Sequence, residues 1–163
     1  MTFLPYLNGE RIGGSVNARA QFFGITAAHT PAHFFRAVME GVAFASRRNL
    51  DLIRIAGESP ERLILCGGGA KGSPWPQVKA SIYNLPLDVP ENPEGWLVGC
   101  AMLAAVGTNT LPDFATAVQR MLRMGHTFLP DPQAVDQYAR QFELYEALYR
   151  SSAAHYDFFD DSD

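Results

Sequence analysis

The chain has 163 residues, of which 47% are hydrophobic and 18% charged, and its formal net charge is −4. This length suits one domain with its own core, and the apolar fraction excludes intrinsic disorder. Its longest basic run is Arg47 and Arg48, so it lacks the basic face of a nucleic-acid binder. The longest apolar stretch, residues 96–106, is far shorter than the ~20 residues of a membrane-spanning helix. Neither nucleic acid nor membrane is therefore expected as a partner.

The first half of the chain alternates short apolar runs with one long periodic segment. Residues 1–25 are rich in turn formers, and within them residues 20–25 predict a strand that closes on a turn. Thr30 as a cap and Pro31 as the first helical residue begin a helix of about 25 residues, which ends before Gly57. Residues 62–66 form a continuous apolar run, typical of a central strand buried on both faces.

The second half predicts a further strand among several helices. A helix begins at Pro74 and reaches about Asn84, residues 85–89 form a short strand, and a helix rich in small residues runs from Glu94 to Gly107. Small side chains allow close backbone approach, so this last helix is expected to lie against the sheet or a ligand. Helices over residues 112–124 and 132–155 follow, and the acidic tail 157–163 is expected to be disordered. The order of elements predicts an α/β fold.

Both cysteines lie in apolar runs, Cys66 at the end of residues 63–66 and Cys100 within residues 97–102. Such positions predict buried free thiols in a reducing compartment. The N-terminus shows no basic region followed by an apolar one, as a secretory signal would. The sequence therefore predicts a cytoplasmic domain without a zinc site.

Two further polar patterns have structural explanations. His29 and His33 have the spacing of a helical metal pair, but Pro31 lies between them at the helix start and no carboxylate or thiol is near in sequence. No metal site is expected, and His33 is expected to form a hydrogen bond near the start of the helix. Glu40 lies in an otherwise apolar helix and needs a partner, which Arg36 one turn earlier supplies as an ion pair.

The most informative feature is the glycine turn, which we define as residues 67–70 (GGGA), between the apolar run and the helix from Pro74. Backbone N–H groups without side chains approach a ligand closely, and a following helix favours phosphate at its N-terminus. A tight turn without a ligand explains the glycines equally well. The turn is neither a Walker A loop nor a G-x-G-x-x-G fingerprint, and no Ser-His-Asp or Cys-His arrangement follows from spacing.

At this point the chain resembles the C-terminal region of the FGGY carbohydrate kinases, and in particular the xylulokinase-like members. The resemblance rests on three ordered groups of residues, supported upstream by residues 6–11 (YLNGER). The first group is residues 20–25, 33–34 and 37–44 (AQFFGI, HF, AVMEGVAF). The second is residues 67–71, Trp75, Gln77, Ala80 and 86–87, and the third is Glu94 with residues 99–104 (GCAMLA).

The resemblance implies a part of an actin-like (ribonuclease H-like) ATPase domain, here an N-terminally truncated C-terminal domain over residues 1–163. The parent enzyme would be a phosphotransferase with an alcohol group as acceptor, which moves the γ-phosphate of Mg²⁺-bound ATP to a sugar or polyol. A pentulose such as xylulose is the expected substrate. The residues implied in binding ATP or ADP are Gly67, Gly68, Gly69, Ala70 and Ser73.

The family's catalytic base is an aspartate of the N-terminal domain, and nothing in this chain aligns with it, so no catalytic or metal-binding residue is assigned. No turnover is expected from this chain alone. Two alternatives stay open: a non-catalytic chain that forms a homodimer, or a subunit that becomes active beside a chain with the N-terminal kinase domain. One departure from the family pattern, Gly95 followed by the bulky Trp96, places an indole near the expected nucleotide.

Overall fold

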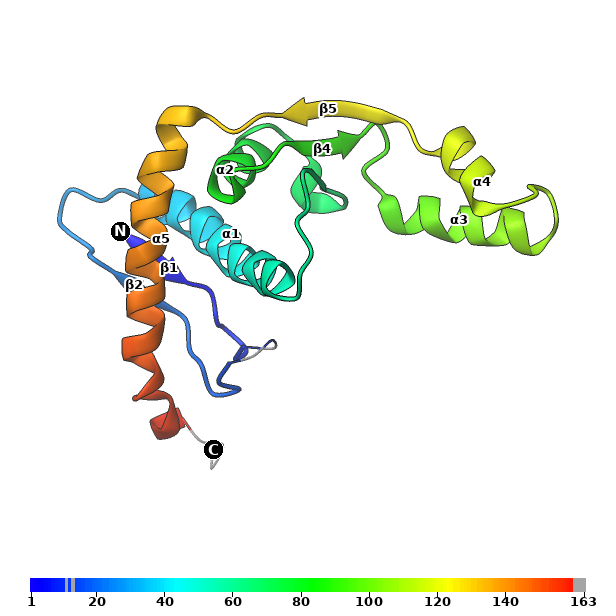
Figure 1. Cartoon of the computed structure of the whole chain (residues 1–163). Helices are drawn as coiled ribbons and strands as arrows, with labels where there is room; N and C mark the ends of the chain where they lie inside the picture. Colours follow the sequence, from blue (N-terminus) through cyan, green and yellow to red (C-terminus); the bar gives the residue numbers. More distant parts are fainter. Residues whose placement is uncertain (11, 13, 160–163) are drawn as a thin grey trace. The chain divides into compact units, whose positions relative to one another are not determined.

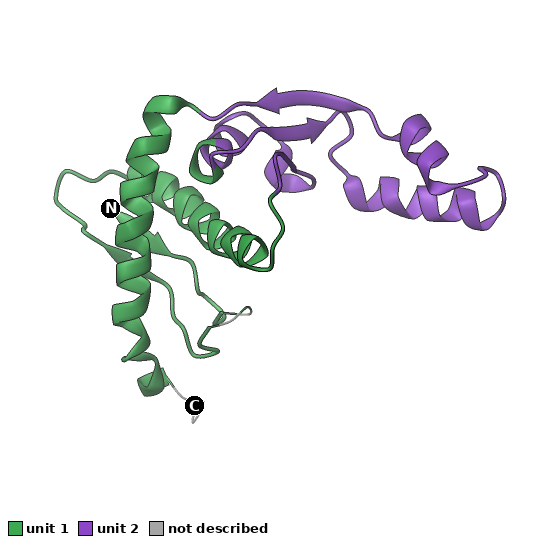
Figure 2. Ribbon diagram, viewed as in Figure 1, with its two compact units in different colours: residues 1–59, 81–83, 131–163 green, residues 60–80, 84–130 purple. Residues whose placement is uncertain are grey.

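The computed structural model describes residues 1–10, 12 and 14–159, whose contacts cluster into two compact units (Figure 2). Unit 1 comprises Met1–Ser59, Ser81–Tyr83 and Asp131–Asp163, and unit 2 comprises Pro60–Ala80 and Asn84–Pro130. Within the described residues, no helix combines the length and apolar character that crossing a membrane demands. Each unit has its own small sheet.

Unit 1 packs two long helices against a short antiparallel pair of strands (Figure 1). The strands are β1 (Thr2–Leu4) and β2 (Gln21–Phe23), and the helices are α1 (Pro31–Ile55) and α5 (Pro132–Ala153). The core is aromatic: the ring of Phe44 on α1 lies 5.5 Å from that of Tyr145 on α5, and both side chains are almost fully buried. A side chain at Gly41 would overlap the backbone carbonyl of Phe3, so this glycine lets α1 approach β1 closely.

Both ends of α1 follow from local sequence signals. At its start, the Thr30 N–H donates to Nδ1 of His33 at 3.1 Å. At its end, Gly57 takes φ +97, its N–H donates to the Arg54 carbonyl, and the Glu58 N–H donates to the Ile53 carbonyl. These two bonds form a Schellman motif. The predicted extent of this helix and the role of His33 are confirmed.

Unit 2 contains a three-stranded sheet and a pair of helices. The sheet has the order β3 (Leu63–Ile64), β4 (Leu87–Pro90), β5 (Met124–Phe128), with β3 and β4 parallel and β5 antiparallel to β4. The 3₁₀ turn η1 (Gly68–Ala70) and α2 (Pro74–Tyr83) follow β3, and the last three residues of α2 belong to unit 1. The helices α3 (Gly95–Gly107) and α4 (Phe114–Met121) pack on each other (Figure 1).

The structure confirms the α/β class and the strands and helices predicted around residues 21, 63, 87, 74, 95, 114 and 132. It adds two strands that the sequence did not predict, β1 and β5. The helix predicted over residues 112–124 is shorter, because β5 takes up its last residue.

Burial differs from prediction at several apolar positions. Ile64 is 54% exposed, so β3 is not buried on both faces. Cys66 and Cys100 are free, as expected, but both are exposed rather than buried. α3 packs on α4 and has no buried residue, which contradicts the expected close approach to a sheet. Local apolar runs do not reveal which face of an element is covered.

The C-terminal tail is described in part. A 3₁₀ turn, η2 (Tyr156–Phe159), follows α5, and the Phe159 carbonyl accepts a hydrogen bond from Arg19 at 3.2 Å. Residues 160–163 lie outside the described residues. Disorder of the tail 157–163 stays a prediction.

Candidate functional site

The glycine turn leaves β3 and tightens into η1 before α2 begins. Gly67 takes φ +79, a conformation that residues with side chains rarely adopt. Within the turn, the Ala70 N–H donates to the Gly67 carbonyl at 3.0 Å and the Lys71 N–H to the Gly68 carbonyl at 3.2 Å. The predicted order of strand, glycine turn and helix from Pro74 is confirmed, and residues 68–70 of the turn form η1. Ser73 lies after η1, as the N-cap residue of α2.

Three contacts bring the start of α3 beside this turn. The Gly67 N–H donates to the Pro93 carbonyl at 2.6 Å, and Lys71 Nζ forms an ion pair with Glu94 Oε1 at 2.8 Å. A Cβ on Gly95 would lie 2.8 Å from the Cys66 sulfur. This close contact with Cys66 therefore explains why position 95, where the sequence departs from the family pattern, is a glycine.

The opposite side of the turn packs against α2. A Cβ on Gly69 would lie 3.1 Å from the ring of Trp75 and 3.5 Å from Nζ of Lys79. The Lys79 ammonium lies 4.1 Å from the centre of the Trp75 ring, a cation–π distance. Only 8% of the surface of Lys79 is exposed, and this burial lowers the pKa of its ammonium.

The turn offers backbone groups to an anion. The first N–H groups of a helical turn, here those of Gly68 and Gly69, have no acceptor within the turn itself. A Cβ on Gly67 or Gly68 would meet no atom of the described residues within 4 Å, so this side of the backbone is open. With the Lys79 ammonium nearby, such a backbone suits a phosphate better than a cation.

The predicted site residues are thus brought together in part. Residues 67–70 form one compact turn, and Ser73 follows it at the start of α2. The indole of Trp96 is 85% exposed at the start of α3. The sequence reasoning missed Trp75 and Lys79 as a pair behind the turn. Their spacing of four residues in a predicted helix was the available signal.

The other polar candidates have structural roles. The ring nitrogen Nδ1 of His29 accepts a hydrogen bond from the Thr26 N–H at 2.9 Å. Across the described part of the chain, no group of three or more metal-ligating side chains occurs. The predicted pair of Arg36 and Glu40 is confirmed at 2.7 Å, and the Tyr138 hydroxyl donates to the same Glu40 oxygen at 2.9 Å.

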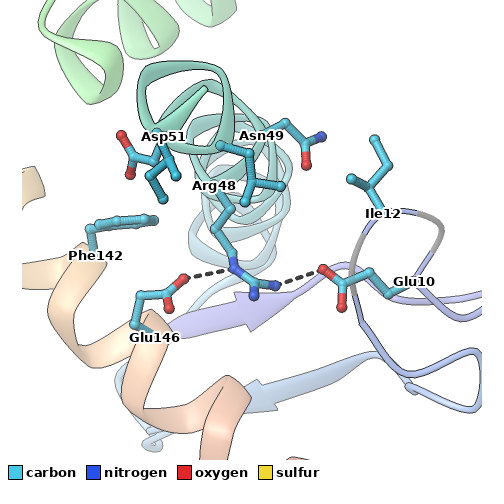
Figure 3. Close-up of a pocket in the computed structure, with 9 residues that line it drawn as sticks. Glu10, Ile12, Arg48, Asn49, Asp51, Phe142 and Glu146 are labelled. Carbon is cyan, nitrogen blue, oxygen red and sulfur yellow. Dashed lines mark hydrogen bonds and ion pairs between the residues drawn. The ribbon is translucent and has the colours of Figure 1, made fainter. Parts of the chain in front are cut away.

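Two cavities among the described residues lie away from the glycine turn. A cavity of about 290 Å³ in unit 1 is lined by α1, α5 and the segment after β1, with Arg48 between Glu10 and Glu146 (Figure 3). A smaller one of about 90 Å³ in unit 2 lies between Pro90 and Arg123. Neither is lined by residues of the glycine turn.

Comparison with known proteins identifies the family. Residues 1–108 match the family model described as "FGGY family of carbohydrate kinases, C-terminal domain". The chain belongs to the FGGY carbohydrate kinases. The xylulose kinase of Bacillus subtilis is 35% identical over 150 residues, which are 91% of this chain and 30% of that protein. The L-xylulose/3-keto-L-gulonate kinase of Escherichia coli is 32% identical over 146 residues, or 90% of this chain and 29% of that protein.

Solved structures agree with this assignment. The ligand-bound xylulose kinase of Lactobacillus acidophilus superposes with a TM-score of 0.86 at 28% identity, over 98% of this chain and 32% of that one. A xylulose kinase from Brucella ovis gives 0.83 at 30% identity, over 94% and 32%. The fold is that of the C-terminal domain of FGGY sugar kinases, of the actin-like ATPase class. This FGGY chain spans about a third of the length of these relatives.

Proposed function

We propose that residues 1–163 supply the nucleotide-binding domain of an ATP-dependent carbohydrate kinase. In the complete enzyme, the γ-phosphate of ATP passes to a hydroxyl of a sugar or polyol. The family assignment supports the reaction class. Several curated relatives, including those of Bacillus subtilis and Escherichia coli, are named xylulose kinase, which favours a pentulose such as xylulose as the acceptor.

The observation that carries the proposal is the glycine at position 68. Gly67 is favoured by its positive φ, and Gly69 by the Trp75 ring, which would lie 3.1 Å from a Cβ there. Gly68 has neither a positive φ nor an atom within 4 Å of a Cβ among the described residues, so packing and backbone geometry both accept a side chain there. A ligand seated on the open backbone accounts for a glycine that the fold does not require.

In this proposal, the N–H groups of Gly68 and Gly69 face the diphosphate of ATP or ADP, with Gly67 and Ala70 shaping the turn and Ser73 near the nucleotide. Mg²⁺ bound to ATP neutralises charge on the transferring phosphoryl group. Phosphoryl transfer also needs a base for the acceptor hydroxyl, which by the family pattern is an aspartate outside this chain. We therefore expect no turnover from residues 1–163 alone, and ADP release stimulated by a sugar would contradict this.

The proposal is tested by thermal unfolding with and without saturating Mg-ADP. Ligand at about 100 times its dissociation constant stabilises the folded chain by about 2.7 kcal/mol, which raises Tm by roughly 5–10 °C at this size. Gly68→Glu places a carboxylate on the open backbone and should abolish the shift. Gly107→Glu is the matched control, since Gly107 is also exposed, has no positive φ and has open space around a Cβ.

If Mg-ADP does not move the melting curve of the unsubstituted chain, the nucleotide proposal is wrong. An equal shift in the unsubstituted chain and in Gly68→Glu would retain nucleotide binding but move it away from the glycine turn. Loss of the shift in both variants would show that any added carboxylate is disruptive.

A second candidate role is association with another chain, because unit 2 exposes large apolar side chains. These include Trp96 (85% exposed), Leu97 (67%), Leu129 (64%), Leu103 (61%) and Phe114 (52%). Exposed apolar surface of this kind marks interaction sites. Light scattering on the purified chain tests for a homodimer. Co-expression with a chain carrying the N-terminal kinase domain, followed by a xylulose kinase assay, tests for a complementing subunit.

A further inference from the structure

The chain has only two lysines, and both lie around the glycine turn. Lys71 is exposed and forms its ion pair with Glu94 at the surface. Lys79 differs from Lys71 in both exposure and partner: only 8% of its surface is exposed, and its ammonium packs on the Trp75 ring. Within the part of the chain that the structure describes, no carboxylate forms an ion pair with Lys79 Nζ.

A buried ammonium without a carboxylate partner is costly, because it loses its hydration. The same burial lowers the pKa of the ammonium through the loss of hydration. The Trp75 ring compensates part of the cost through its negative face. An anion bound nearby would therefore stabilise the buried ammonium further.

The position of this charge relates it to the turn. Nζ lies 3.5 Å from where a Cβ on Gly69 would stand, and at the neighbouring Gly68 a Cβ would meet no atom of the described residues within 4 Å. Charges in a poorly hydrated environment are screened less than surface charges. A phosphate on the turn would therefore be attracted to the Lys79 ammonium more strongly than at the same distance in water.

We propose that Lys79 is an anion-binding residue of the glycine turn, whose buried ammonium attracts the diphosphate seated on the backbone of Gly68 and Gly69. This inference rests on the proposed nucleotide function and adds a residue to it. Lys79 holds the charge, Trp75 fixes the side chain, and Gly69 leaves room for both. Lys71 contributes little, because its charge is already paired with Glu94 and faces solvent.

The test is isothermal titration of the full chain with Mg-ADP, pyrophosphate and adenosine. Lys79→Met keeps a long unbranched side chain and removes the charge. We expect Lys79→Met to bind ADP and pyrophosphate about tenfold more weakly, a difference of about 1.4 kcal/mol. Adenosine carries no phosphate, so its affinity should stay within twofold of that of the unsubstituted chain. Lys71→Met, the same change beside the same turn, should leave all three affinities within about threefold.

The outcomes separate the two proposals. If the unsubstituted chain binds neither ADP nor pyrophosphate, the nucleotide function and this inference both fall. Equal ADP affinity in the unsubstituted chain and Lys79→Met overturns the role of Lys79 alone. A parallel loss of adenosine and ADP binding in Lys79→Met also overturns it, because that pattern indicates a packing role rather than an electrostatic one.

A second measurement covers the case in which Lys79→Met fails to fold. Lysine-selective ¹³C labelling of the unsubstituted chain gives two ε-methylene signals, which Lys71→Met assigns. Pyrophosphate at saturation should shift the Lys79 signal and leave the Lys71 signal nearly in place. An unmoved Lys79 signal under saturating pyrophosphate overturns the proposal.

Discussion

Arg48 forms ion pairs with two glutamates of unit 1, so its removal should be costly. Its guanidinium pairs with Glu10 Oε1 at 2.7 Å and with Glu146 Oε1 at 2.8 Å (Figure 3). The same group donates a hydrogen bond to the Tyr6 hydroxyl at 3.0 Å. It also lies 3.8 Å from the centre of the Tyr149 ring. One side chain on α1 thus connects the segment after β1 with α5.

The cost of Arg48→Met follows from what it leaves behind. The carboxylates of Glu10 and Glu146 are only 10% and 25% exposed, and without Arg48 both would lose their cationic partner, although the Tyr149 hydroxyl would still donate to Glu10. Breaking a fully buried pair by removing one partner costs about 3–5 kcal/mol, and partial solvent access reduces this to about 2–4 kcal/mol here. The control is Arg54→Met, which breaks a surface pair with Asp51 and should cost about 0–1 kcal/mol.

The assay is urea unfolding followed by far-ultraviolet circular dichroism and by tryptophan fluorescence. Both tryptophans, Trp75 and Trp96, lie in unit 2, whereas Arg48 lies in unit 1. The loss should appear in the circular dichroism transition, and the double variant Arg48→Met/Glu10→Gln should regain part of it, since it removes one of the two carboxylates left without a cationic partner. A loss below about 1 kcal/mol, or one equal to that of Arg54→Met, would refute the reasoning.

Three further predictions concern unit 2. Gly95→Ala should destabilise the chain by about 1–3 kcal/mol because its Cβ meets the Cys66 sulfur, whereas Gly99→Ala in the same helix, with open space, should stabilise it by about 0.5–1 kcal/mol; chemical denaturation measures both. Asp88→Asn should lower the free energy of unfolding by about 1.5–3 kcal/mol in the same experiment. The Asp88 carboxylate is only 3% exposed, accepts a hydrogen bond from Thr127 Oγ1 at 2.6 Å and forms an ion pair with Arg62. Burial lowers the pKa of Lys79 in the folded chain below its ordinary 10.5, so between these two values the unfolded chain holds a proton that the folded chain has released. We therefore expect the free energy of unfolding of the unsubstituted chain, minus that of Lys79→Met, to rise with pH up to about 10.5. Urea titrations in which this difference stays constant or falls would contradict the lowered pKa of Lys79.

Local signals in the sequence were sufficient for the long helix α1. Its cap, its first-turn proline and the glycine after its end are all determined within a few residues. The pair of Arg36 and Glu40 is similarly local, since one helical turn separates them. Such features depend little on the rest of the fold, which is why they could be predicted.

Features that depend on distant partners could not be predicted from the sequence. β5 has the sequence MGHTF, which lacks a strand pattern, and it exists because it pairs with β4 almost forty residues earlier. At its Gly125, a Cβ would come within 3.1 Å of the Val89 carbonyl oxygen, so the strand depends on a close backbone approach. Exposure of Cys66 and Ile64 likewise depends on which elements cover β3, and the apolar run carries no such information.

The glycine turn combines features set by the local sequence with features that depend on distant partners. The sequence revealed three consecutive glycines, but it could not separate a tight turn from a binding surface, because both explanations use the same residues. The structure assigns separate reasons to two of them: Gly67 serves the backbone conformation and Gly69 the contact with Trp75. Gly68 serves neither, since a Cβ on it would meet no atom of the described residues within 4 Å. The ligand that we propose on this turn would account for the third glycine, which packing and backbone conformation leave unexplained.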